Sequence, residues 1–286
     1  MGNDTVKKID EYIANMPSLP TSVAKVLEVC NNPQTSPADL NHVISLDPVL
    51  VGRVLKLINS AYYGLGQQVT SLVRAIIMIG INTVKNLALS TSIVGNLSKN
   101  KAAAGLDMEG FWRHSLCVGV AAKTIAKKRG VDSKQWEEYF AAGLLHDIGK
   151  IPLNAVLEKD YLMVISSSDR DKLSMVRSED RILGINHCGV GGMIVKSWKL
   201  DGPVGDAIIF HHNHTSYEGD HRDLLYTTIL ANRFALETET GFSGDIHFEK
   251  PGPSVWEALE ITPDIFEEIS EKVTSEIEKA EIFLKL

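Results

Sequence analysis

The sequence predicts an all-α protein. Apolar residues recur at the i, i+3, i+4, i+7 spacing that places them on one face of a helix. One such run is Val23, Val26, Leu27 and Cys30. Cap residues followed by proline, Ser36-Pro37 and Asp47-Pro48, stand where such runs begin, and proline is favoured in the first turn of a helix. Alternating strand patterns are almost absent, and a short strand is conceivable only within 241–253.

The first 100 residues predict a compact bundle of five short helices. Thr21 is expected to cap the first, and the prolines of the two cap pairs open the next two. Gly64 and Gly66 then interrupt the pattern before the last two helices. The five segments are expected to begin near Thr21, Ser36, Asp47, Leu72 and Thr83.

A second helical half is predicted to follow a linker at 99–105, which is rich in Lys, Ala, Asn and Gly. The next helix, 107–129, carries His114 on one stripe with apolar residues, so we expect His114 to point inward. Ser133 is expected to cap the helix after that. That apolar helix ends in the pair His146-Asp147.

Within this helix, Gly143 would allow another helix or a ligand to approach closely. Residues 152–178 predict a helix followed by a loop over a polar Ser/Asp stretch. A helical region then begins at Ser178 and carries His187, and Pro203 opens a helix that leads to His211 and His212. The remaining segments are expected to be a helix over 221–239, a loop over 241–253 and an amphipathic helix from Thr262 to Leu284.

Composition excludes several classes of function. With 286 residues, 44% of them hydrophobic and 23% charged, the chain can form one large or two small globular domains. It has no apolar run of 18 residues and no apolar signal segment near Met1, so we expect a cytoplasmic protein without a membrane partner. The net charge of −7 argues against a nucleic-acid surface, which needs clustered Lys and Arg.

Two smaller groups of residues are expected to be structural. The basic cluster of Lys123, Lys127, Lys128 and Arg129 is interpreted as a solvated helix end. The three cysteines are far apart, odd in number and set among apolar residues, so we interpret them as reduced core residues. They are Cys30, Cys117 and Cys188.

Five of the nine histidines fall on or beside inward-facing stripes. They are His114, His146, His187, His211 and His212. Each alone could be a hydrogen-bonded core histidine, but burying several imidazoles without a common partner would leave many polar nitrogens unsatisfied. Together with the carboxylate of Asp147 they predict a metal pocket, because imidazole nitrogen and carboxylate oxygen suit Zn, Fe, Ni or Mn. The alternative is that the histidines only fill a core.

The chain also resembles a known family. Four blocks in order, Met16-Pro-Ser-Leu-Pro20, Ile44-Ser-Leu-Asp47-Pro48, Leu57-Ile-Asn59-Ser60-Ala61 and Ala75-Ile-Ile-Met-Ile-Gly80, are similar to the N-terminal half of the HDOD family of bacterial signalling domains. The similarity continues through Glu179, Gly184, His187, Gly191 and Trp198 to His211, and so covers about residues 10–215. It implies a regulatory protein.

The order His, His-Asp, His, His-His further resembles the HD superfamily of metal-dependent phosphohydrolases, most closely the binuclear HD-GYP branch. That resemblance implies a first metal position with His114, His146 and Asp147. It implies a second position with Asp147, His187, His211 and His212. In such an enzyme Asp147 and Lys150 would be the catalytic residues, with Lys150 contacting substrate phosphate; the alternative for Lys150 is a solvated lysine at a helix end.

This sequence departs from that branch in two places. Asn232 stands where an acidic residue would complete the first metal position, and residues 213–220 lack the Gly-Tyr-Pro signature linked to cyclic di-GMP hydrolysis. The resemblance therefore implies a regulator that retains a metal pocket, and an active metal-dependent phosphohydrolase acting on a nucleotide or cyclic dinucleotide is the alternative.

These inferences together predict an N-terminal bundle of short helices over 1–100 and an HD-like helical half over 106–240. A loop and a C-terminal amphipathic helix are expected over 241–286. We expect one or two divalent transition metal ions, and either a signalling protein partner or a small nucleotide-like ligand.

Overall fold

The computed structural model describes residues 2–285 except 17–18, 33 and 98–104. Within these ranges every regular element is a helix and no strand occurs, including in 241–253, so the prediction of an all-α protein is confirmed. The expected linker at 99–105 lies outside the described residues apart from Gly105.

The five helices predicted in the N-terminal part are present. They are α2 (Thr21–Cys30), α3 (Pro37–Ser45), α4 (Pro48–Ile58), α5 (Leu72–Ile79) and α6 (Ile81–Leu97). The Ser36 side chain accepts the amide of Asp39, which confirms one predicted cap. Asp47 caps α4 in the same way. The predicted cap at Thr21 is wrong, because Pro20 holds the N-cap position and Thr21 is already helical.

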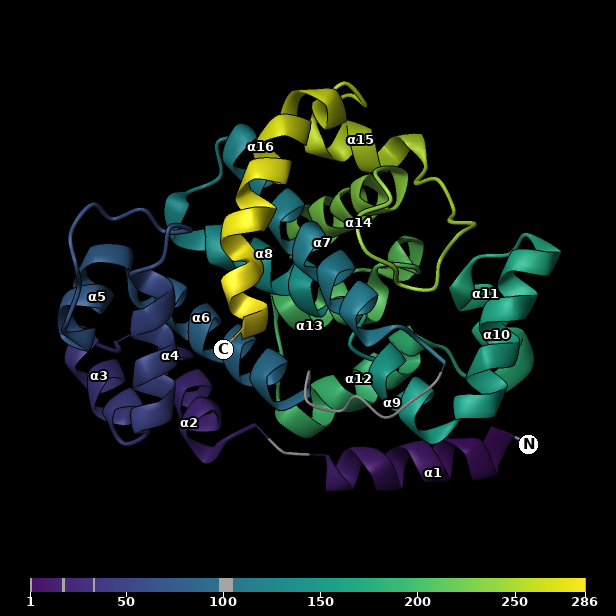
Figure 1. Ribbon diagram of the computed structural model, residues 1–286, viewed down its shortest axis with the longest axis horizontal. Helices are drawn as coiled ribbons and strands as arrows, with labels where there is room; N and C mark the ends of the chain where they lie inside the picture. The colour runs from purple at the N-terminus through teal and green to yellow at the C-terminus, as the bar shows by residue number, and fades with distance from the viewer. Residues whose placement is uncertain (1, 17–18, 33, 98–104, 286) are drawn as a thin grey trace.

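A further helix, α1 (Gly2–Asn15), precedes this bundle and was not predicted. It packs against α9 (Lys150–Val156) and α12 (His187–Trp198), along the lower edge of Figure 1. Its side chains Ile9 and Ile13 are buried, whereas most of its other positions are polar and exposed. Such a helix is stabilised mainly by the surface that it covers, which local sequence does not show.

Two helices that pack against each other form the centre of the molecule, α7 (Met108–Lys128) and α8 (Trp136–Leu145). A Cβ atom at position 143 would lie 2.7 Å from the carbonyl oxygen of Val118, so Gly143 lets the two helices touch as predicted. The predicted cap at Ser133 is wrong: Asp132 accepts the amide of Lys134 and caps the short helix η1 (Ser133–Gln135).

The segment predicted as helix then loop is instead a run of helices. After α9 come α10 (Glu158–Asp171) and the start of α11 (Met175–Leu183). Beyond this segment, the helices predicted to carry His187 and to begin at Pro203 are present as α12 and α13 (Pro203–Phe210). The loop prediction fails because Ser167 and Ser168 are buried in α10, and the Ser168 hydroxyl donates to the Leu173 carbonyl just beyond its end. The helical region expected to start at Ser178 begins three residues earlier.

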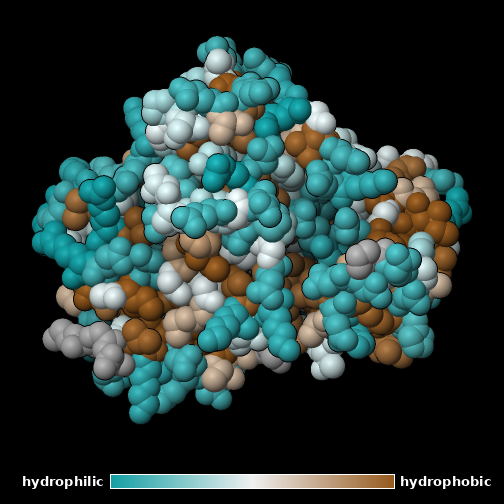
Figure 2. Space-filling model, turned by 180° about the vertical axis from the view of Figure 1, so that it is seen from behind, coloured by the Kyte–Doolittle hydropathy of each residue, from teal (hydrophilic) through white to brown (hydrophobic). Residues whose placement is uncertain are grey.

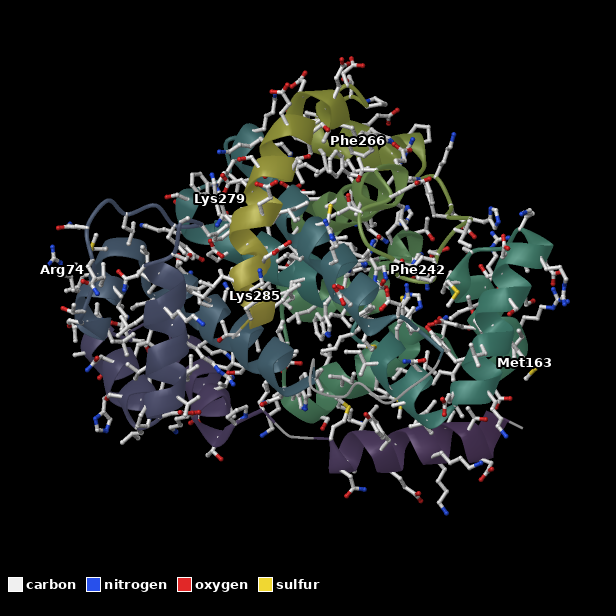
Figure 3. All side chains as sticks on the ribbon, in the orientation of Figure 1. Arg74, Met163, Phe242, Phe266, Lys279 and Lys285 are labelled. Carbon is white, nitrogen blue, oxygen red and sulfur yellow. The ribbon has the colours of Figure 1, made fainter. Side chains whose placement is uncertain are left out.

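The chain closes with helices that cover the central pair. They are α14 (Arg222–Glu237), α15 (Pro253–Leu259), α16 (Ile265–Ala280) and η3 (Glu281–Lys285). Both α14 and α16 pack on α7, while α6 and α13 pack on α8. Figure 3 shows Arg74 of α5 and Met163 of α10 projecting at opposite ends of the long axis.

No single helix among those described is long and apolar enough to cross a membrane. Only the pair α5 and α6, taken together, is long and apolar enough among the described residues, and the two helices are bent by 116° relative to each other.

Candidate metal centre

The central helix α8 delivers His146 and Asp147 to the interior. Buried apolar residues fix α8 in the core, and the helix ends at Leu145. His146 Nδ1 lies 2.7 Å from the Gly143 carbonyl oxygen one turn earlier, so its ring N–H donates there and Nε2 is left free. His146 and Asp147 are 0% and 1% exposed.

Three histidines from the region of α12 and α13 converge on the same carboxylate. His187 is the first residue of α12, and His211 and His212 follow α13. Asp147 Oδ1 lies 3.3 Å from His187 Nε2 and 3.5 Å from His211 Nε2. The ring of His212 lies 4.4 Å from that of His211. The four residues each place one donor atom within 4.8 Å of the others.

A second group forms on the other side of Asp147. His146 Nε2 lies 3.3 Å from Asp147 Oδ2, and the rings of His114 and His146 are 5.7 Å apart. One donor atom each from His114, His146 and Asp147 again falls within 4.8 Å. Asn232 Oδ1 is 3.0 Å from His114 Nε2, so Asn232 stands beside this group as the sequence analysis expected.

All six residues predicted as metal ligands are therefore brought together, in the two sets predicted. Metal binding itself stays a prediction. The groups that orient the rings were not predicted as such from the sequence. One of these groups is Glu179 of α11, which is completely buried. Its Oε2 lies 2.5 Å from His187 Nδ1 and also accepts a hydrogen bond from the His187 amide. Its other carboxylate oxygen accepts a hydrogen bond from the Tyr161 hydroxyl.

His211 Nδ1 is oriented in turn by the Ala207 carbonyl, at 2.9 Å. A carboxylate or carbonyl behind the ring is the usual arrangement for histidines that bind metals, because it fixes the tautomer and frees Nε2. The contact with Glu179 does not follow from local spacing, since Glu179 belongs to a different helix from His187, whereas the Ala207 carbonyl lies one helical turn before His211.

The arrangement fits a transition metal. Three buried polar atoms of the cluster, His146 Nε2, Asp147 Oδ1 and His212 Nε2, have no hydrogen-bond partner among the described residues. Because Nδ1 of His187 and of His211 faces an acceptor, both Nε2 atoms point into the cluster, where they are 3.3 Å apart. Both would offer lone pairs to a metal ion once His211 has lost its extra proton. Donors about 2.1 Å from one tetrahedral ion are separated by about 3.4 Å. These donors are thus spaced as around a shared cation.

The electrostatics agree with that interpretation. Burial lowers the pKa of His114 to about 3 and the pKa values of His187 and His212 well below the usual range, which keeps these rings neutral. Burial acts on His211 in the same sense, but Cys188 and Asp147 outweigh it and raise the pKa of His211 to about 9. The cluster therefore favours a positive charge at that point.

Asp147 supplies the anion. Burial alone would raise its pKa, but the interactions with His146 and Lys150 hold the pKa of Asp147 well below its usual range. Lys150 Nζ lies 2.7 Å from Asp147 Oδ2 and donates to the Ser243 carbonyl at 3.1 Å. Lys150 is only 1% exposed, so its interpretation as a solvated helix-end lysine is wrong. It holds Asp147 and anchors the loop that carries Ser243.

A hollow of about 70 Å³ leads from the surface to the cluster. His211, His212 and Asn232 line its inner wall, and Arg233 and Lys250 line its outer part. A small polar molecule in this hollow would meet His212, whose Nε2 is one of the unpartnered atoms.

The chain is 26% identical over 238 residues to an uncharacterized protein of Treponema pallidum (strain Nichols), and the aligned region covers 82% of this chain. The chain spans 45% of the length of that relative.

Among solved structures, an HDOD domain protein of unknown function from Geobacter sulfurreducens matches with a TM-score of 0.76 and 24% identity, over 99% of both chains. A candidate phosphohydrolase from Shewanella amazonensis SB2B matches with a TM-score of 0.70 and 23% identity, over 97% of this chain and 98% of its own. These similarities establish a shared helical fold.

The sequence model of the HDOD domain matches residues 16–214. This range holds both parts of the fold described above, from the start of the N-terminal bundle to the histidines that follow α13. The chain belongs to the HDOD domain family.

Proposed function

We propose that this chain is a bacterial signal-transduction protein that holds a transition metal ion in its His/Asp cluster and acts through a protein partner or a small ligand. The metal would be Fe, Mn, Ni or Zn, bound by Asp147, His187, His211 and His212. Its role would be to fix the arrangement of α8, α12 and α13, which supply these ligands.

The observation that carries this proposal is the position of Asn232 beside His114. Its amide is neutral and lies against His114, where the catalytic branch of the superfamily has an acid. The two groups of donors therefore share one carboxylate, Asp147, because the buried Glu179 is engaged by His187. Two divalent ions need more anionic ligands than that, so a binuclear phosphodiesterase site is disfavoured.

The N-terminal bundle supplies a surface for a protein partner. Leu46, Val49 and Ile77 are large apolar residues that are 72%, 64% and 68% exposed. They lie on α3, α4 and α5 or at their ends, and these three helices contact one another. Figure 2 shows hydrophobic side chains over this lobe, at the right of the view. Exposed apolar surface of this kind is typical of protein interaction sites.

The test of this proposal is turnover of cyclic di-GMP by protein loaded with manganese or iron. We expect hydrolysis no faster than in protein treated with a chelator, because the first metal position lacks its second anion. Robust turnover that disappears in His146→Ala and Asp147→Ala would overturn the regulatory proposal.

The second candidate is a metal-dependent phosphohydrolase with a single metal. It is favoured by the complete donor set of His187, His211, His212 and Asp147. It is also favoured by the hollow that reaches two of these residues, His211 and His212. A bound metal would supply Lewis acidity toward a phosphate oxygen. Arg233 and Lys250 would attract the anionic substrate at the rim, and Lys150 would hold Asp147 in position. Hydrolysis of a mononucleotide by the unmodified protein, lost in His187→Ala, would favour this candidate.

A further inference from the structure

Lys123 is buried at the joint between the N-terminal bundle and the central helices, so its interpretation as part of a solvated helix end is wrong. Its side chain forms an ion pair with Glu137 of α8, and the two residues are 7% and 4% exposed. Lys123 Nζ also lies 4.4 Å from the ring centroid of Tyr62 and 5.2 Å from that of Tyr63. Both tyrosines follow α4, so this ion pair connects the two parts of the fold.

A cavity of about 430 Å³ opens beside this group. Lys123, Glu137 and the two tyrosines line it, and Ile77, Met78 and Trp136 form an apolar side. It is large enough for a drug-sized molecule, since ligand pockets typically measure about 300–1,000 Å³.

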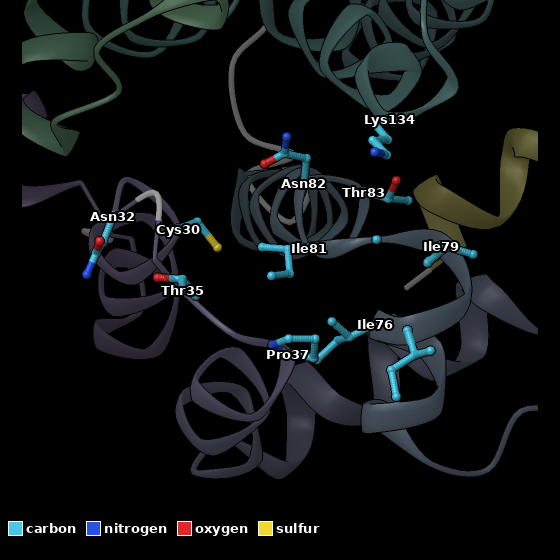
Figure 4. A pocket seen from close by; sticks show the side chains of 12 residues that line it. Cys30, Asn32, Thr35, Pro37, Ile76, Ile79, Ile81, Asn82, Thr83 and Lys134 are labelled. Carbon is cyan, nitrogen blue, oxygen red and sulfur yellow. The ribbon is translucent and has the colours of Figure 1, made fainter.

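A second hollow, of about 620 Å³, lies next to this cavity and is seen in Figure 4. The two share part of their lining, including Gly80, Thr83 and Lys134. Figure 4 shows Lys134 and Thr83 at one end of the second hollow. Lys134 therefore stands where the two spaces meet.

Polar atoms in the cavity wall lack partners. Glu137 Oε2 and the hydroxyl of Tyr62 are buried and have no hydrogen-bond partner within the described part of the chain, and the residues are 4% and 9% exposed. The hydroxyl of Tyr63 is in the same state. Leaving a buried polar atom unsatisfied costs about 1–3 kcal/mol. A molecule that donates a hydrogen bond to Glu137 would remove this cost.

The charge of the wall selects an anion. The lining of the cavity includes three lysines, Lys123, Lys127 and Lys134, but only one carboxylate, that of Glu137. Glu137 is already paired with Lys123. The Lys127 ammonium lies 4.7 Å from the ring centroid of Trp136, and no ion pair to a carboxylate is found for it among the described residues. Two ammonium groups thus remain for a bound anion, beside aromatic and apolar side chains suited to a ring.

We propose that this cavity binds a small organic anion of the nucleotide class. The phosphate would lie against Lys127 and Lys134, a donor group of the base would bond to Glu137, and the ring would pack against Trp136 and Met78.

The proposed site is separate from the metal centre. Trp136 and Glu137 begin α8, and His146 and Asp147 follow its other end. A helix of ten residues is about 15 Å long, so a nucleotide at the joint would not touch the metal ligands. It would contact the helix that positions them, and it would bind whether or not a metal is present.

The experiment is isothermal titration with GMP as the probe, alongside guanosine and inorganic phosphate. We expect GMP to bind, and guanosine or phosphate alone to bind at least about tenfold more weakly, because each lacks one half of the contacts. The double variant Lys127→Ala/Lys134→Ala should lower the affinity for GMP at least about tenfold. Both lysines are exposed, so the fold should be retained. The matched control, Lys159→Ala/Lys196→Ala, removes the same charge from exposed positions on α10 and α12 and should leave binding unchanged.

Two results would overturn this proposal: no binding of GMP at millimolar concentration, or equal binding by the double variant and the wild type. The His187→Ala variant separates it from the proposed function. GMP binding that survives in His187→Ala places the nucleotide at the joint, whereas binding that is lost with His187 would assign it to the metal centre and contradict the proposed site.

Discussion

At the residue scale, Asn232 is the neutral residue that lies against His114 in the first group of donors. The group of His114, His146 and Asp147 has the geometry of a metal position but no second anion. The group on the other side of Asp147 has three imidazoles and is spaced as around one cation. One metal ion per chain is the stoichiometry that these contacts favour.

Asn232→Asp should raise the metal content from about one toward two ions per chain, because the new carboxylate would offset the charge of a second ion. Metal analysis of protein purified without an affinity tag measures this. Asn213→Asp is the matched control, since it adds the same charge close to His212 but belongs to neither group. Two ions in the unmodified protein would show that Asn232 or water already completes the first position.

A second prediction at this scale concerns Glu179. Glu179→Gln removes the anionic acceptor of His187 Nδ1 and should weaken metal binding about 10- to 100-fold, the usual effect of losing such a partner. Competition against a chromogenic chelator measures the affinity.

Tyr161→Phe is the control for this variant, because it removes a hydrogen bond to Glu179 and leaves the carboxylate in place. His187→Ala should abolish the tighter site. Metal affinity that is insensitive to both Glu179→Gln and His187→Ala would leave only the core-histidine interpretation.

At the scale of elements, the contact between α7 and α8 positions both proposed sites. These helices approach closely because Gly119 and Gly143 carry no side chain: an added Cβ at either position would lie within 2.9 Å of a backbone oxygen of the other helix. Since α8 carries Glu137 near its start and leads into His146, a shift of this helix would move the joint and the metal centre together.

Gly143→Ala should lower the free energy of unfolding by about 1–3 kcal/mol, because the added methyl group would meet rigid backbone of α7. Chemical denaturation measures the change. Gly52→Ala in α4 is the control: its Cβ would meet nothing within 4 Å, so alanine should stabilise that helix by about 0.5–1 kcal/mol. Equal effects of the two substitutions would contradict the tight contact.

At the scale of the whole molecule, the metal ligands come from helices far apart in the sequence, and α1 covers two of the elements near them. An ion bound by Asp147, His187, His211 and His212 would therefore link the end of α8, α12 and the segment after α13. Such a link stabilises the folded state relative to the unfolded chain, in which the ligands are dispersed.

Removing the metal should lower the midpoint of thermal unfolding by several degrees. At a free metal concentration of about 100 times Kd the bound ion contributes about 2.7 kcal/mol. Thermal unfolding with and without a chelator, followed by circular dichroism, measures the shift. His187→Ala should respond little to the chelator; an identical response in this variant and the wild type would mean that the chelator acts elsewhere.

The sequence by itself determined the helical class, most helix starts and the two sets of donors. The helical class and the helix starts rest on local signals, which are the Ser36 and Asp47 caps and the apolar periodicity. Each signal acts within a few residues, so it can be recognised without knowing the rest of the fold. The division of the donors into two sets was implied by the resemblance to the HD superfamily, and the structure brings the members of each set together.

Only the tertiary structure decided which polar residues are buried. Lys123 and Lys150 look like exposed helix-end residues along the chain, yet each is buried because a carboxylate, Glu137 or Asp147, lies against it. Glu179 is joined to His187 in the same way, and α1 is held by α9 and α12. A buried charge is tolerated only where a partner offsets its desolvation. Most of these partners come from other helices, so the packing of the helices, and not the local sequence, decides which charged residues are buried.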